Sequence, residues 1–68
     1  MRWTDVTRIS EELADTYPDF DGPKVQYIRF TDLHAKVMAL PGFKDAADRS
    51  NEKILEAIQA AWLDEIDD

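Results

Sequence analysis

Residues 50–66 read SNEKILEAIQAAWLDEI, the longest helical pattern in the chain. Ser50 is of a type that often caps the start of a helix, and the apolar residues after it recur every three or four positions. That spacing puts the following residues on one face of an α-helix: Ile54, Leu55, Ile58, Trp62 and Ile66. The stretch therefore predicts a helix over 51–66, capped by Ser50, whose apolar face lies at the centre of the core.

Two shorter helical patterns precede this one. The first spans 5–17 and ends before Pro18, because the residue before a proline avoids the helical conformation. The second spans 31–40, with Thr31 as the expected N-cap and Pro41 ending it. Apolar residues at helical spacing mark the inward face of each helix. Together with the third helix they give the expected core: Val6, Ile9, Leu13, Tyr17, Phe30, Leu33, Val37, Leu40, Ile54, Leu55, Ile58 and Trp62.

Residues 25–30, between the first two helices, are rich in β-branched and aromatic side chains, which favour a strand. We expect either a short strand paired with another extended segment, or an extended connector packed on the helices. The chain is therefore predicted to be mainly α, a single domain over 1–68 with three helices and a short extended segment. This order of elements is similar to the start of a winged-helix domain, but the chain ends with the third helix and leaves no room for a C-terminal wing.

The chain carries 15 acidic and 8 basic residues, a net charge of −7, and the charge is unevenly distributed. Residues 1–21 hold six acidic and two basic residues, residues 51–68 hold six and one, and the middle is mildly basic. Two acidic ends disfavour nucleic acid and an anionic membrane surface, since both require basic residues to neutralise phosphate. They favour a basic protein partner or a hard cation, and a solvated acidic surface is the simpler alternative.

The sequence lacks features that several other functions require. No cysteine is present, which excludes disulfides, thiolate metal sites and a cysteine nucleophile. A single histidine and the lack of a glycine-rich phosphate loop argue against an enzyme. No apolar run approaches the ~20 residues of a membrane helix and no signal peptide opens the chain, so we expect a cytoplasmic protein.

Three ring side chains have both a structural and a functional interpretation. His34 is a candidate iron ligand or pH-sensitive contact, but packing or capping at the start of a helix is the favoured interpretation. Trp62 lies on an apolar stripe and is assigned to the core. Trp3 precedes the first helix and is a candidate either for a hydrophobic staple or for an interface anchor.

Five short strings, spread over nearly the whole chain, occur together: Trp3-Thr4-Asp5, Tyr17-Pro18-Asp19, Arg29-Phe30-Thr31-Asp32-Leu33-His34, Ser50-Asn51-Glu52-Lys53-Ile54-Leu55-Glu56-Ala57-Ile58 and Trp62-Leu63-Asp64-Glu65. In combination they resemble the IscX family, small acidic proteins of bacterial iron–sulfur cluster assembly. The resemblance implies a modified winged-helix fold and binding to the cysteine desulfurase IscS in competition with frataxin. It also implies weak iron binding through surface carboxylates, and no catalysis.

The resemblance and the charge pattern lead us to expect two kinds of acidic site. Iron accepts hard oxygen ligands, so converging carboxylates are chemically suitable. The expected iron ligands are Asp19, Asp21 and Asp32 at one location, and Asp64, Glu65, Asp67 and Asp68 at another. The expected partner-binding residues are Asp5, Glu11, Glu12, Asp15, Asp64 and Glu65. The expected function is a monomeric acidic adaptor or regulator that binds the desulfurase, and the alternative is a stand-alone iron donor or buffer.

Overall fold

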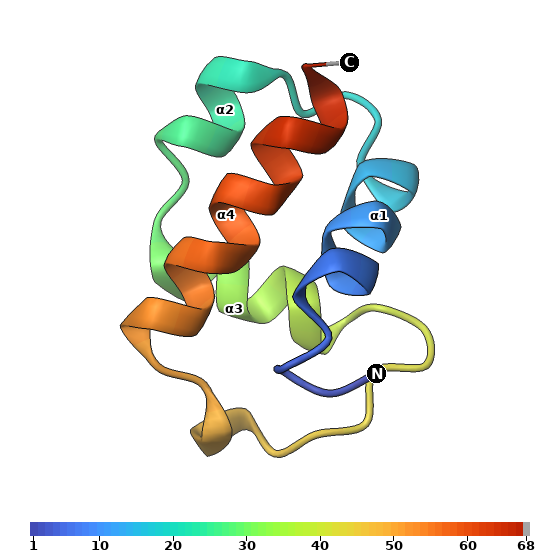
Figure 1. Ribbon diagram of the computed structural model, residues 1–68, viewed down its shortest axis with the longest axis vertical. Helices are drawn as coiled ribbons and strands as arrows, with labels where there is room; N and C mark the ends of the chain where they lie inside the picture. The colour runs from blue at the N-terminus through green and yellow to red at the C-terminus, as the bar shows by residue number, and fades with distance from the viewer. Residues whose placement is uncertain (68) are drawn as a thin grey trace.

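The computed structural model describes residues 1–67, a range that contains helices and no strand (Figure 1). The elements in chain order are α1 (Val6–Thr16), α2 (Gly22–Gln26), α3 (Phe30–Met38), the 3-10 helix η1 (Ala47–Arg49) and α4 (Glu52–Ile66). None of these helices is long and apolar enough to cross a membrane. The prediction of a small, mainly α fold is confirmed.

The centre of the fold is α4, which packs against α1, α2 and α3, while α1 also packs against α3 (Figure 1). Its apolar stripe buries Leu55, Ile58 and Trp62, as its spacing predicts. Fully burying one such large side chain contributes about 1.5–3 kcal/mol. Eight members of the expected core are buried: Ile9, Leu13, Leu33, Val37, Leu40, Leu55, Ile58 and Trp62.

The expectation of a strand over 25–30 is wrong, because Gly22–Gln26 form the short helix α2 and Phe30 begins α3, so that only residues 27–29 form a connector. The start of α2 carries strong local signals. Asp21 is its N-cap, and the Asp21 carboxylate accepts a hydrogen bond from the backbone N–H of Lys24 at 3.1 Å. Pro23 occupies the first turn, where its fixed φ suits a helix and its missing N–H costs nothing. These two effects outweigh the strand preference of the apolar residues that follow.

The far end of α2 is held by a residue of α4. The Gln59 side-chain amide donates hydrogen bonds to the carbonyl oxygens of Val25 at 2.9 Å and Gln26 at 2.8 Å. These carbonyls are among those that a helix end leaves without an internal partner. Val25 is fully buried, while Tyr27 beyond the helix is 79% exposed. Contacts from a distant element therefore complete a helix too short to be stable alone.

The expected caps of the second and third predicted helices are each displaced by one or two positions. Arg29 is the N-cap of α3, so Thr31 lies inside the helix and does not cap it. Asn51 caps α4, because its side-chain oxygen accepts a hydrogen bond from the N–H of Ile54 at 2.9 Å. Ser50 precedes that cap, and its hydroxyl instead donates a hydrogen bond to the carbonyl of Ala47 in η1 at 3.3 Å.

The observed core differs from the expected one in two residues that were not expected to be buried and four that are less buried than expected. Trp3 and Val25 are fully buried core residues that helical periodicity does not reveal, because they lie outside the three long stripes. Four expected core residues lie at the edge of the core and are only half-buried: Val6, Tyr17, Phe30 and Ile54. The difference follows from position, since each of the four sits in the first or last turn of its helix or just beyond it.

Candidate docking surface

The outer face of α1 is acidic. Ile9, Ser10 and Leu13 are buried on the inner side of α1, which leaves the opposite side of the helix facing outward. Glu11 and Asp15 are exposed one turn apart, and Glu12 is half-buried. The expected partner-binding residues of α1 therefore lie on a surface that a second protein can reach.

A second group of carboxylates lies where α4 ends. Asp64 and Glu65 are exposed in the last turn, and Asp67 is the exposed C-cap. Asp68, one of the expected iron ligands, lies outside the described residues. Figure 1 shows that the carboxyl-terminal ends of α1 and α4 and the turn over 17–21 lie at the same end of the molecule. The two acidic segments, far apart in sequence, thus meet in space.

We call this region the acidic end and define it by Asp15, Asp19, Asp21, Asp64, Glu65 and Asp67. The segments 15–24 and 62–67 together carry six acidic residues and one basic residue. The opposite end, formed by residues 1–5 and 41–53, carries four of each (Figure 1). Both long helices also direct the negative ends of their dipoles toward the acidic end, which adds to its negative potential.

The remaining expected partner residue, Asp5, lies apart from the acidic end. It is the exposed N-cap position of α1, and its carboxylate accepts a hydrogen bond from the N–H of Arg2 at 2.9 Å. Its role in the structure is to fold the amino-terminal residues back before α1 begins.

The structure does not assemble the expected iron ligands into a preformed site. Within residues 1–67, no group of three or more histidine, aspartate or glutamate side chains is arranged to hold a metal ion. Asp21 is engaged as the N-cap of α2, and Asp32 lines a groove on α3 described below. The donor sets of Asp19, Asp21 and Asp32, and of Asp64, Glu65 and Asp67, therefore do not fit a resident iron centre.

His34 and Trp3 form a clasp between the amino terminus, α3 and the loop before η1. Trp3 is 1% exposed, and its Nε1–H donates to the carbonyl of Ala46 at 2.7 Å. The His34 ring lies 5.0 Å from the Trp3 ring, and its Nε2 is hydrogen-bonded to the carbonyl of Ala47 at 2.8 Å. The packing interpretation of His34 and a structural role for Trp3 account for these contacts.

Asp45 closes the same clasp. Its carboxylate accepts hydrogen bonds from the backbone N–H groups of Trp3 at 3.1 Å and Ala46 at 2.8 Å. The hydrogen bond from Trp3 is the largest cause that lowers the pKa of Asp45, and nearby Arg49 and Arg2 act in the same direction. The amino-terminal segment is thus anchored by a carboxylate that stays ionised at neutral pH.

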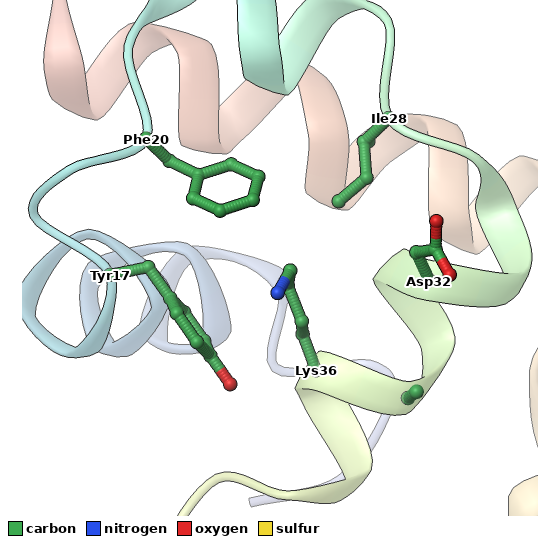
Figure 2. A pocket seen from close by; sticks show the side chains of 6 residues that line it. Tyr17, Phe20, Ile28, Asp32 and Lys36 are labelled. Carbon is green, nitrogen blue, oxygen red and sulfur yellow. The ribbon is translucent and has the colours of Figure 1, made fainter.

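An open groove runs between the turn after α1 and the side of α3 (Figure 2). Its lining residues are Tyr17, Phe20, Ile28, Asp32, Ala35 and Lys36. Figure 2 shows the Lys36 ammonium directed at the two aromatic rings, while the Asp32 carboxylate lies at the far edge of the groove and points away from them. The sequence pattern does not predict this groove. The available signal was the pair Asp32 and Lys36 at helical i, i+4 spacing, but nothing local places the rings opposite them.

The fold and the acidic surface can be compared with known proteins. A family model described as iron–sulphur cluster assembly matches residues 1–67 of this chain. The uncharacterized protein PA3808 of Pseudomonas aeruginosa is 46% identical over 67 residues, which cover 98% of this chain and 97% of that protein. Both matches extend over essentially the full chain, so the resemblance found in the short strings is confirmed. The chain belongs to the iron–sulphur cluster assembly family of IscX-like proteins.

Proposed function

We propose that this protein is a non-catalytic adaptor of iron–sulfur cluster assembly that docks on a basic surface of the cysteine desulfurase IscS. The observation that carries the proposal is the acidic end, where the last turns of α1 and α4 meet (Figure 1). Membership in a cluster-assembly family supports a partner within that system.

The charge distribution supports docking through electrostatic attraction. One end of the molecule is strongly acidic and the other is balanced, so the protein has a preferred orientation in the field of a basic partner. Exposed carboxylates raise the association rate and select partners of opposite charge more than they add raw affinity. An adaptor that binds reversibly needs this kind of contact.

The proposal of a non-catalytic role rests on how the reactive residues are used. The only histidine is stacked on Trp3 and hydrogen-bonded to Ala47, so it serves the clasp. Cysteine, the usual sulfur-carrying nucleophile, does not occur in the sequence. In this proposal, the chemistry of cluster assembly is supplied by the partner.

The family resemblance extends the proposal to three further points. The protein acts as a monomer that contacts one desulfurase protomer, it competes with frataxin for the basic surface, and it works in the cytoplasm. Iron binding is proposed as weak and exchangeable, through pairs of carboxylates such as Asp64 and Asp67 that leave most iron ligands to water. An adaptor is preferred over a stand-alone iron donor because residues 1–67 contain no preformed metal group.

The test is a matched pair of charge reversals measured by desulfurase titration. Glu11→Lys with Asp15→Lys reverses two exposed carboxylates one turn apart on α1. Glu52→Lys with Glu56→Lys makes the same change in net charge, also one turn apart, at the other end of α4. We expect the α1 pair to weaken binding at least about tenfold, as loss of two favourable charge contacts implies, and the α4 pair to weaken it far less.

Circular dichroism and thermal unfolding verify that both double variants fold. Equal losses of affinity in the two variants would show that net charge alone matters and that the side of α1 that carries Glu11 and Asp15 is not the docking surface. Unchanged affinity in the α1 variant would reject the α1 face directly.

A further inference from the structure

The groove on α3 holds a cation against two aromatic rings. The Lys36 ammonium lies 4.4 Å from the centroid of the Tyr17 ring and 4.7 Å from that of Phe20. Both distances are within the range in which a cation is attracted to the negative face of a ring. The two ring faces therefore already hold a positively charged group, the ammonium of the chain's own Lys36.

The rings of Tyr17 and Phe20 are held in place by packing, whereas the Lys36 ammonium sits at the end of a flexible side chain. Phe20 is stacked on Trp62 with 5.4 Å between ring centroids and 23° between planes, and Trp62 is fully buried in the core. Tyr17 meets Phe20 edge to face at 6.0 Å. Lys36, in contrast, is half-buried and reaches the rings on a flexible four-carbon stem. Its ammonium can leave for solvent without moving any element of the fold.

The charges around the groove favour a cationic occupant. Asp32 lines the groove itself, and Asp19 and Asp21 are exposed on either side of Phe20 in the same turn. Lys36 points at the rings and not at the Asp32 carboxylate (Figure 2). Once Lys36 swings out, the groove offers two ring faces and a carboxylate, which suits a cation and repels an anion.

We propose that this groove receives an arginine side chain of the partner protein, which displaces Lys36 from the rings of Tyr17 and Phe20. A guanidinium group is planar and stacks on aromatic rings, so it fits the two rings better than an ammonium does, and the negative charge of Asp32 at the edge of the groove favours its approach. Its displacement of Lys36 makes the groove a specificity pocket at the edge of the acidic end. The identity of the partner rests on the proposed function; the chemistry of the groove does not.

Whether Lys36→Met raises or lowers the affinity for the desulfurase distinguishes this proposal from its alternatives. Lys36→Met removes the competing cation while keeping a flexible apolar stem, and Lys24→Met removes an exposed lysine of α2 outside the groove. In a titration with the desulfurase, we expect Lys36→Met to bind about two- to fivefold more tightly than Lys24→Met, the size of one exposed cation–π contact. Asp32→Asn is expected to weaken binding.

Two outcomes overturn the proposal. Weaker binding of Lys36→Met than of Lys24→Met would mean that the groove receives a carboxylate paired with Lys36. Equal binding of the two variants would mean that the cation–ring contact serves only the fold.

A second experiment tests the groove without the desulfurase. The protein carrying Lys36→Met is titrated with N-acetyl-arginine amide, with N-acetyl-glutamate amide as control, while the ring proton signals of Tyr17 and Phe20 are followed by NMR. Shifts with the arginine compound alone support the proposal, even if the desulfurase does not bind. Shifts with neither compound or with both equally overturn it, even if the desulfurase binds through α1.

Discussion

Trp3 and Trp62 are both buried, but they differ in whether the indole Nε1–H is hydrogen-bonded, and this difference affects the free energy of unfolding. Trp3 is 1% exposed and its Nε1–H donates to Ala46. Trp62 is fully buried, and within the described residues its Nε1–H has no hydrogen-bond partner. A buried donor without a partner carries a desolvation cost, whereas a paired one contributes about 0.5–1.5 kcal/mol.

Replacing each tryptophan by phenylalanine removes a similar ring volume from the core. We therefore expect Trp3→Phe to lower the free energy of unfolding by about 1–2 kcal/mol more than Trp62→Phe does, because only Trp3→Phe also loses a hydrogen bond. Urea unfolding followed by circular dichroism measures both values. Equal losses would show that the Trp3 hydrogen bond makes no net contribution.

Asp45 makes the stability of the fold depend on pH. Its pKa is lowered from an ordinary value of 3.8, first by the hydrogen bond from the Trp3 N–H. A carboxylate whose pKa is lower in the folded state adds stability that is present above the unfolded pKa and is lost as pH falls through the folded pKa. The contribution is therefore complete at neutral pH, begins to decrease near pH 4, and is lost as the pH falls further through the lower folded pKa.

The substitution Asp45→Asn is expected to lower stability at pH 7 and to flatten the loss of stability on acidification. The control is Asp48→Asn, which removes an exposed carboxylate of η1. Thermal unfolding from about pH 2 to 7 gives the two profiles. If both variants follow the same pH profile, the clasp does not depend on the Asp45 charge.

At the scale of elements, the sequence was informative where a pattern is long. The helices α1, α3 and α4 have two or more turns of apolar periodicity, so their existence and inward faces were predicted. The five residues of α2 span less than two turns and show no period. Their helical state depends on the Asp21 cap and on Gln59, which lies more than 30 residues away.

In the candidate site, too, some features were predicted from the sequence and others depend on packing between elements. The individual carboxylates of the acidic end were predicted from composition, but their gathering at one end depends on how α1 and α4 pack. The groove was not predicted, because Tyr17 and Phe20 come from one connection and Lys36 from another helix. Packing between elements, which no local pattern encodes, decides both features.

The link between α2 and α4 gives an element-scale prediction. Gln59→Ala removes the donor to the carbonyls of Val25 and Gln26, whereas Gln26→Ala removes only an exposed side chain of the same type. We expect Gln59→Ala to cost about 1–2 kcal/mol in unfolding free energy and to increase amide hydrogen exchange selectively in α2. Equal exchange rates in the two variants would mean that Gln59 does not hold α2.

For the whole molecule, the separation of charge predicts where cations accumulate. Titration with iron(II) is expected to broaden amide NMR signals over 15–21 and 64–67 weakly, with much less effect over 41–53. Manganese is expected to give the same pattern and a chelator to reverse it, because carboxylates without a fixed surrounding shell discriminate poorly between such ions. Asp64→Asn with Asp67→Asn should remove the effect at the end of α4 only.

Tight and iron-selective saturation at one location would contradict this prediction. It would require at least three ligands to converge, and residues 1–67 hold no such group. Uniform broadening over the whole surface would instead show that the acidic end is not a preferred location for cations.

The central place of α4 has a consequence for how the protein is made. Because α4 packs against every other α-helix, the core cannot close until the ribosome has synthesised residues 52–66. Until then the nascent chain exposes the apolar faces of α1 and α3 and the Trp3 ring, which are binding sites for chaperones and for one another. Folding is therefore completed late, when α4 leaves the ribosome and packs against α1, α2 and α3.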